Sequence, residues 1–258
     1  MATANPAANM AVYRQAGIAE SPAASMTLSG TALKTMVLVV VLLVGFGYSW
    51  SQAISGLTAS AEGPRVIPAS AIGLLTIGAI GAFVVAMVTI FIPRAAPLTA
   101  PIYAVLEGLA LGGISGVFET VYPGIAFEAV VLTVGTLVVM LVVYATGVIR
   151  ATRNFVIGIV AATGGICLVY LADFIASLFG VRLPVIHESG WLGIGFSLFI
   201  VIVAALNLIL DFDFIERGVE SQAPKYMEWY GGFSLLVTLV WLYLEMLRLL
   251  TKLRNSRN

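Results

Sequence analysis

Five acidic residues lie inside long apolar stretches of this 258-residue sequence: Glu107, Asp173, Asp211, Asp213 and Glu245. A charged side chain at the centre of a bilayer costs at least about 2.5–3.5 kcal/mol, so such residues mark ion pathways, proton relays or ion pairs. Two ionised carboxylates can bind a divalent cation such as calcium through their oxygen atoms. Two neighbouring carboxylates can also share a proton and respond to pH. The two properties compete, because a proton neutralises a ligand of the cation.

Glu107 and Asp211 are the strongest candidates for this chemistry, because neither has a basic residue close to it in the sequence. Asn207 precedes Asp211 by four residues and lies on the same helical face, so we expect its amide to donate to the carboxylate. We predict that Asp211 and Glu107, with Asn207 and Glu245 as further members, form a cation- and pH-sensing site. Asp211 and Glu107 are the predicted calcium ligands.

Simpler explanations exist for the other three acids. Glu245 and Arg248 are three residues apart, a spacing that predicts an ion pair on one helical face near the membrane surface. Asp213 and Asp173 lie near the ends of apolar segments, where water can solvate them. These three residues therefore need no functional role to account for their presence.

Enzymatic chemistry has little support. His187 is the only histidine, so a Ser-His hydrolase or a histidine-based metal site lacks its parts. A membrane aspartyl protease would need paired aspartates, and the candidates Asp173 and Asp211 lie near opposite membrane faces. The only cysteine, Cys167, lies within an apolar run and is interpreted as a buried core thiol. We predict no enzyme, no cofactor and, from a net charge of zero, no nucleic-acid partner.

The elements that carry these residues are membrane-spanning segments. The sequence is 60% hydrophobic and 10% charged, whereas soluble domains are about 45–50% apolar and about 25% charged. A helix needs about 20 residues to cross the hydrocarbon, and helices satisfy all their own backbone groups there. We predict an all-α polytopic membrane domain over residues 30–254, between a disordered tail (1–29) and a short polar tail (255–258). Seven apolar segments meet the length criterion: Thr35–Thr58, Pro68–Ile92, Thr99–Val121, Ile125–Ile149, Phe155–Phe179, Gly190–Ile215 and Trp229–Leu250.

Basic residues in the short loops indicate the orientation. With a cytoplasmic N-terminus, the inner side has the larger set: Arg14, Lys34, Arg94, Arg150, Arg153, Arg217 and Lys225. The outer loops keep only Arg65 and Arg182. The basic C-terminal end disagrees with this orientation if the last segment crosses the membrane, and a re-entrant last segment would remove the conflict. Seven full spans are preferred, because Trp229–Leu250 is long enough to cross.

This topology sorts the acids by depth, at about 1.5 Å of rise per residue. Glu107 and Asp211 fall toward the inner side of the membrane. Asp173 and Glu245 fall toward the outer side, with Glu119 at the rim. Asp173 and Glu119 are therefore candidates for an outer vestibule.

Three stretches resemble one known family. Ala204–Ile215 (AALNLILDFDFI) is similar to its sixth helix, an apolar run that ends in an aspartate. Glu228–Tyr230 and Leu242–Leu250 (LYLEMLRLL) are similar to its last helix, and Tyr103–Ser115 (YAVLEGLALGGIS) to its third. Their order and spacing resemble the bacterial branch of the Bax inhibitor-1 family over about Lys34–Lys252.

This resemblance implies a seven-helix bundle with a central last helix, acting as a pH-sensitive calcium leak in the bacterial inner membrane. It also implies a proton-sensing carboxylate pair between the sixth and last helices. Asp211 matches the aspartate of the sixth helix. Glu245 matches the partner in one alignment, whereas aligning Glu228 puts Thr238–Leu239 there, which cannot ionise. Glu107 is then the preferred partner of Asp211.

A second hypothesis belongs to a different class. The chain would be a regulatory scaffold that binds a membrane protease or another membrane protein and conducts nothing. Both hypotheses place the chain in the lipid bilayer, but only the first needs calcium and protons as ligands. A scaffold has no need of Glu107 and Asp211 buried together.

Overall fold

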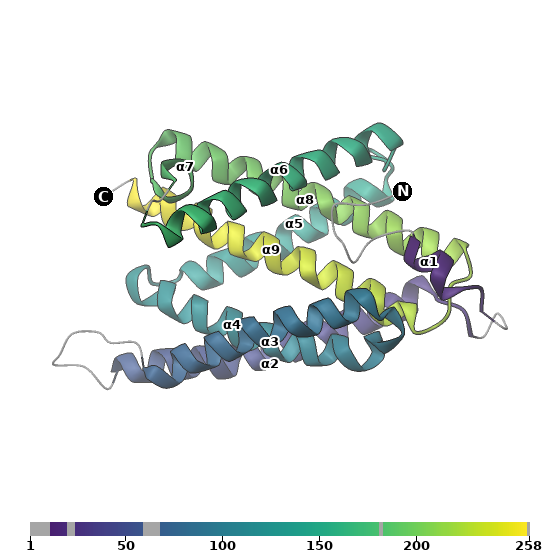
Figure 1. Cartoon of the computed structure of the whole chain (residues 1–258), viewed down its shortest axis with the longest axis horizontal. Coiled ribbons are helices and arrows are strands. Elements are labelled where there is room, and N and C mark those ends of the chain that lie inside the picture. The colour runs from purple at the N-terminus through teal and green to yellow at the C-terminus, as the bar shows by residue number, and fades with distance from the viewer. Residues whose placement is uncertain (1–10, 20–23, 59–67, 181–182, 257–258) are drawn as a thin grey trace. The chain divides into compact units, whose positions relative to one another are not determined.

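A computed structural model of the chain describes residues 11–19, 24–58, 68–180 and 183–256 (Figure 1). Within these residues, seven helices are long and apolar enough to cross a membrane, which confirms the predicted all-α fold. Two short helices, α1 (Ala11–Ala16) and α7 (Pro184–His187), and the 3₁₀ turn η3 (Pro93–Ala95) accompany them. The seven long helices are α2 (Leu28–Thr58), α3 (Ala69–Phe91), α4 (Ala96–Val121), α5 (Ile125–Ala145), α6 (Arg153–Leu178), α8 (Trp191–Glu220) and α9 (Met227–Asn255).

Several helices extend beyond the predicted apolar segments. The helix α2 begins seven residues earlier, α8 ends five residues later at Glu220, and α9 continues to Asn255. Apolar length identifies the part of a helix that lies in hydrocarbon, whereas the helix itself can continue into the headgroup region and water. The helix α3 is one residue shorter than predicted at each end, and α5 is four residues shorter. The helix α5 ends at Ala145, and Gly147 follows in the left-handed region at φ 70°.

The predicted disordered tail of residues 1–29 does not hold for its described part. Residues 11–16 form α1, Tyr13 is buried, and Met26 is only 1% exposed. The reason is that this segment carries large apolar side chains that pack against the rest of the chain. The remainder of the tail, residues 1–10 and 20–23, lies outside the described residues, as do the loop positions Arg65 and Arg182.

The helices form two compact units. The α6 unit contains Phe127–Phe214 and Val237–Asn258, and the α2 unit contains Val12–Ala126 and Ile215–Leu236. Both α8 and α9 therefore contribute to each unit.

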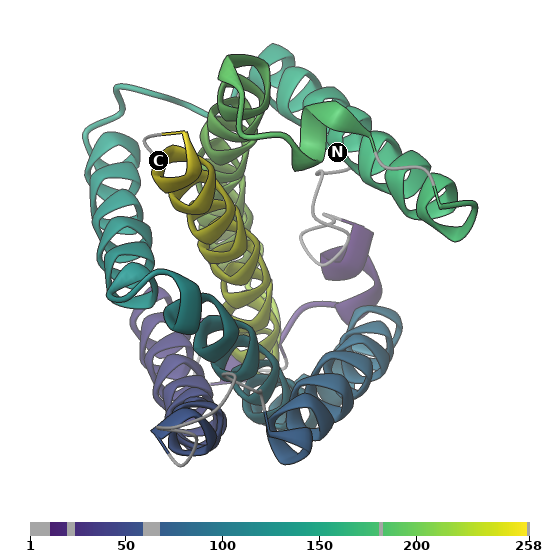
Figure 2. The same ribbon diagram turned by 90° about the vertical axis from the view of Figure 1, so that its left-hand side faces the viewer.

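In the α2 unit, α4 packs against α2 and α3 and lies between them (Figure 2). Glycines permit this close packing. A Cβ atom on Gly108 or on Gly112 of α4 would overlap a backbone carbonyl oxygen of α2. A Cβ atom on Gly78 of α3 would lie 2.6 Å from the Leu106 oxygen. These small residues therefore let α4 approach its two neighbours closely, as is common between membrane helices.

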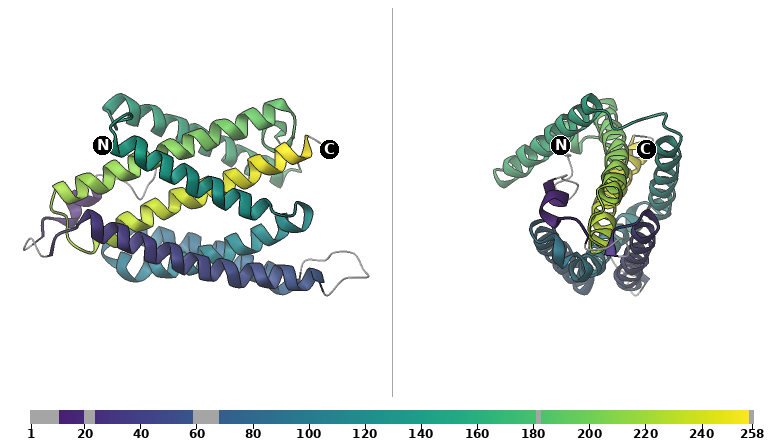
Figure 3. Two further views of the ribbon diagram at one scale, coloured as in Figure 1. Left: turned by 180° about the vertical axis from the view of Figure 1, so that it is seen from behind. Right: turned by 90° about the vertical axis from the view of Figure 1, so that its right-hand side faces the viewer.

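In the α6 unit, α6 packs along α8 through two clusters of apolar side chains. One joins Val156 and Ile159 of α6 to Leu210 of α8. The other joins Ile166 of α6 to Ile200 and Val203 of α8, with Trp241 of α9 packed against it. The helices α8 and α9 run antiparallel (Figure 3), so the Lys252 ammonium reaches the Gly193 carbonyl oxygen at 2.9 Å.

The last helix is the most buried of the seven in the described part of the chain. In an apolar stretch of 18 residues taken from each helix, 67% of the α9 stretch is buried, compared with 11% of the α6 stretch. Tyr230 and Phe233 are fully buried in the α2 unit, and Leu242 in the α6 unit. This burial agrees with a central last helix. The prediction of a buried Cys167 is wrong, because Cys167 is exposed on α6, the least buried helix.

Candidate cation- and proton-sensing site

Asp211 is completely buried on α8, with 0% of its surface exposed. Leu208, three residues before it, is also fully buried, and Ile215, four residues after it, is 8% exposed. Asp213 is half-buried, in keeping with its position about 200° around the helix from Asp211. The two aspartates therefore have different surroundings, because the helical period turns them to different faces of α8.

Asn207 makes contacts other than the predicted one. Its amide nitrogen donates to the Thr163 hydroxyl of α6 at 3.0 Å and to the Val203 carbonyl oxygen at 2.8 Å. Asn207 is thus a link between α6 and α8. Its predicted donation to the Asp211 carboxylate stays a prediction.

Glu245 is 2% exposed and is held by two side chains. The Tyr170 hydroxyl of α6 donates to Glu245 Oε1 at 2.7 Å, and Arg248 Nη1 donates to the same oxygen at 2.9 Å. Arg248 also donates to the Tyr170 hydroxyl, and its guanidinium lies 4.8 Å from the centre of the tyrosine ring. The predicted pair of Glu245 and Arg248 is confirmed. Tyr170 was not identified from the sequence as a partner of Glu245, because the two residues meet only when α6 packs against α9.

The register of α8 and α9 separates Asp211 from Glu245. Trp241 of α9 lies level with Ile200 and Val203 of α8, and the two helices run antiparallel. Asp211 is displaced from this level in one direction and Glu245 in the other. At about 1.5 Å per residue the two carboxylates are roughly 20 Å apart along the helix axes. A direct pairing of Asp211 with Glu245 is therefore not supported.

Glu107 lies half-buried on α4, in the α2 unit. Tyr103, one turn before it, is 4% exposed, and its ring packs edge-on against Phe233 of α9 at a centroid distance of 5.0 Å. Asp211 belongs to the α6 unit, so its pairing with Glu107 stays a prediction. Among the described residues, no three His, Cys, Asp or Glu side chains are grouped so as to hold a metal ion. Calcium binding by Asp211 and Glu107 likewise stays a prediction.

The two acids assigned to an outer vestibule make local structural contacts. Asp173 accepts the backbone N–H of Leu183 at 3.0 Å and contacts His187 Nε2 at 2.9 Å, which joins the end of α6 to α7. Glu119 accepts the backbone N–H groups of Gly124 and Ala126. It thereby satisfies donors at the start of α5, which no earlier turn can satisfy. A vestibule role for either residue stays a prediction.

A family model described as Bax inhibitor 1 like matches residues 5–255. The chain belongs to the Bax inhibitor 1 like family. No curated protein and no solved structure matches it. The resemblance to the Bax inhibitor-1 family is confirmed, whereas assignment to the bacterial branch stays a prediction.

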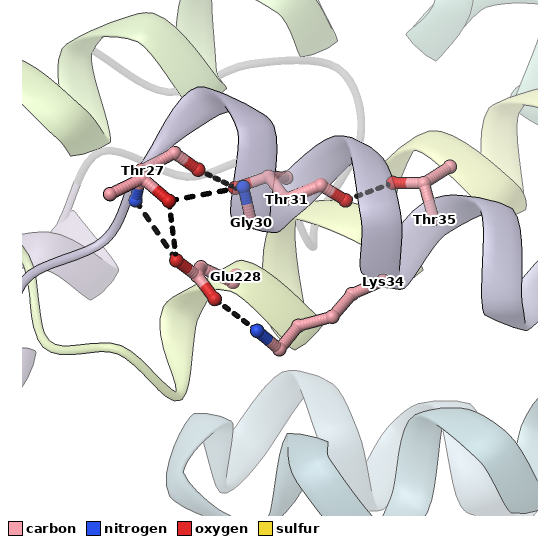
Figure 4. A network of polar contacts seen from close by, with 6 residues as sticks. All are labelled: Thr27, Gly30, Thr31, Lys34, Thr35 and Glu228. Atoms are coloured by element: carbon pink, nitrogen blue, oxygen red, sulfur yellow. Dashed lines mark hydrogen bonds and ion pairs between the residues drawn. The ribbon is translucent and has the colours of Figure 1, made fainter.

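This family member also has a buried acid that was not among the predicted site residues. Glu228, the second residue of α9, is completely buried and pairs with Lys34 of α2 (Figure 4). Thr27, which precedes α2, donates to the same carboxylate through its backbone and its hydroxyl. The sequence does contain one indication of this pair, because Lys34 and Glu228 are charged residues that border the first and last apolar segments. Their pairing across the chain could not be read from either position alone.

Proposed function

We propose that this multi-pass membrane protein is a pH-sensitive cation leak channel or transporter with calcium as its ion and Asp211 as its central carboxylate. The observation that carries the proposal is the complete burial of Asp211 on a helix long and apolar enough to cross a membrane. An aspartate there has a large energetic cost, so it is retained for a reason such as ion or proton binding.

The environment of Glu245 supports the choice of Asp211. Glu245 has its own cation in Arg248 and its own hydroxyl donor in Tyr170. A proton or calcium ion that bound Glu245 would have to displace Arg248. Asp211 lies about 20 Å away along the helix axes, so it is a distinct site. Glu107 is its proposed partner, since it has no sequence-local cation and the predicted topology places it toward the same side of the membrane as Asp211.

The proposed location is the bacterial inner membrane with a cytoplasmic N-terminus.

In the proposed mechanism, calcium binds the ionised carboxylate of Asp211, and protonation of the same oxygens displaces the calcium. Flux and its pH dependence are therefore two consequences of one site.

The experiment is calcium flux into liposomes that contain the purified full-length protein, scanned across pH. The expected result is a flux that exceeds protein-free liposomes and changes with pH. If folded, membrane-inserted protein gives no calcium flux at any pH, the proposal is overturned.

A non-conducting scaffold is the second candidate. It is favoured by Glu245 and Glu228, two buried acids that are each paired with a basic residue and so contribute to structure. Such a scaffold would bind a membrane protease or another membrane protein. The scaffold would be favoured if correctly folded protein in liposomes gave no calcium flux.

A further inference from the structure

The segment before and at the start of α2 is bound to the connection between α8 and α9. We name residues 24–34 the strap. The Met26 N–H donates to the Ala223 carbonyl oxygen at 2.7 Å, and the Lys225 N–H donates to the Ala24 oxygen at 2.9 Å. Two backbone hydrogen bonds thus hold the strap to a connection that follows it by about 200 residues in the sequence.

Glu228 of α9 completes the N-terminal cap of α2. In a capping box, the hydroxyl of the N-cap residue accepts the backbone N–H of the third helical residue, whose own acid accepts the N-cap N–H. Thr27 Oγ1 does accept the Gly30 N–H at 3.0 Å, but Gly30 has no side chain that could accept the Thr27 N–H in turn. Glu228 supplies the acid instead, and its Oε1 accepts the Thr27 N–H at 3.1 Å (Figure 4). A Cβ atom on Gly30 would overlap this carboxylate, so any larger residue there would displace Glu228 from the cap.

The other oxygen of Glu228 pairs with Lys34, one turn further along α2. The side chain of Lys34 is 19% exposed and Glu228 is fully buried, so the pair is largely removed from water. The Lys34 ammonium also lies 5.8 Å from the centre of the Trp229 ring. Removing one partner of such a pair leaves an uncompensated buried charge, which is strongly unfavourable. The pair therefore holds the strap in place for as long as both charges are present.

A second contact covers the end of α8. Met26 of the strap is 1% exposed, and the Tyr13 hydroxyl of α1 lies 3.9 Å from its sulfur atom. Burial raises the pKa of Tyr13, with a smaller contribution from Tyr230, so its hydroxyl stays protonated. A Cβ atom on Gly218 of α8 would overlap the Tyr13 phenol. Tyr13 thus packs directly on the helix that carries Asp211, seven residues or about 10 Å away along α8.

We propose that the strap is a latch: its attachment to Glu228 fixes the α8–α9 connection, and its release lets α8 and α9 move and open the ion path. The release step is a property of the fold alone, whereas its effect on ion flow rests on the proposed function. The latch is positioned to act on Asp211 because an α-helix transmits a displacement of its end along its length.

Release can be measured without ion flux. In a Cys167→Ser background, Met26→Cys places one thiol in the buried part of the strap, and its reaction rate with a water-soluble maleimide reports release. Glu228→Gln should raise this rate at least about tenfold, because the ion pair with Lys34 is lost together with hydrogen bonds to a charged group. Thr27→Val, which removes the N-cap hydroxyl, is a second variant should Glu228→Gln fail to fold. The matched control is Lys225→Met, which alters an exposed lysine of the same connection. Equal rates in wild-type, Glu228→Gln and Thr27→Val proteins would overturn the latch.

The effect on ion flow is tested by locking the strap. Ser25 and Pro224 form an antiparallel bridge flanked by the two backbone hydrogen bonds. The Cα atoms of such a pair are about 4.5 Å apart, within the range of a disulfide. Ser25→Cys with Pro224→Cys, in the Cys167→Ser background, should lose calcium flux on oxidation and regain it on reduction. Each single-cysteine variant should be indifferent to both treatments.

The outcomes separate the two proposals. Equal flux from the oxidised and reduced double-cysteine protein would overturn the role of the latch in gating. If the wild-type protein carries no flux, the proposed function and the gating role both fall, and the maleimide rates still decide whether the strap is released.

Discussion

The hydroxyl of Tyr170 on α6 donates to the carboxylate of Glu245 on α9 at 2.7 Å, and Arg248 completes the contact from one turn further along α9. This carboxylate is therefore bound by a hydroxyl and a guanidinium together. The arrangement attaches α6, the least buried long helix in the described part of the chain, to the most buried one. It gives Glu245 a structural role, which supports the proposal that Asp211 rather than Glu245 is the sensing carboxylate.

Tyr170→Phe tests this structural role. The substitution removes the hydroxyl but keeps the ring that lies against Arg248. We expect a loss of about 1.5–3 kcal/mol in the free energy of unfolding, the usual worth of a hydrogen bond to a charged group. The measurement is denaturant unfolding in detergent micelles. Tyr48→Phe, at a tyrosine of α2 that is 56% exposed, should change stability little. Equal effects of the two substitutions would contradict the role assigned to Tyr170.

The close packing of α2 and α4 gives a second stability prediction. In Gly112→Ala, the added Cβ atom would overlap the Phe46 carbonyl oxygen, and backbone atoms cannot rotate away as a side chain can. We expect a loss of about 1–3 kcal/mol in unfolding free energy, as for other overpacked sites. Gly135→Ala on α5 is the matched control, since open space surrounds the position of its Cβ atom. That variant should be as stable as wild type or more so, and a similar loss in both would rule out the packing explanation.

The orientation predicted from the loop charges can be checked with reporter fusions. A reporter at the N-terminus should be active only in the cytoplasm, because the basic residues of the short loops gather on that side. Seven spans then place a reporter fused after Asn258 on the opposite side. Cytoplasmic activity at both ends would contradict seven full spans and favour a re-entrant last helix.

The seven helices could be predicted from the sequence because crossing hydrocarbon requires a long apolar run. Their ends could not, because helices such as α2 continue past the apolar part. The start of α2 is determined by its N-cap Thr27 and by Glu228, which lies 201 residues away in the sequence. Such a contact leaves no local pattern in either segment.

The candidate site was predictable to a similar degree. Leu208, Asp211 and Ile215 share a helical face, so the burial of Asp211 follows from the period of the helix. The partner of Asn207 depends on Thr163 of α6, a residue that only the folded chain brings near. Cys167 was misassigned because α6 is apolar on all sides, so its sequence does not distinguish lipid-facing positions from buried ones.

Asp211 and Asp213 provide an internal comparison for the proposed function. They are two residues apart on α8, yet Asp211 is completely buried and Asp213 is half-buried. Asp211→Asn should abolish calcium flux into liposomes or remove its pH dependence, because proton and cation compete for the same oxygens. Asp213→Asn should leave both unchanged. An Asp211→Asn protein that is folded and keeps the flux and its pH profile would end the sensing role of Asp211.

The identity of the partner of Asp211 is decided by two further neutral variants. Glu245 is engaged by Tyr170 and Arg248, whereas Glu107 lies half-buried on α4 beside Tyr103. If Glu107 shares the site, Glu107→Gln should change calcium flux and its pH profile in the same way as Asp211→Asn. A double variant of these two residues should then be no worse than either alone, because both substitutions disable one site. Glu245→Gln should instead lower stability and leave the pH profile of the remaining flux unchanged. The opposite pattern, a silent Glu107→Gln and an altered pH profile in Glu245→Gln, would return the sensing role to the last helix.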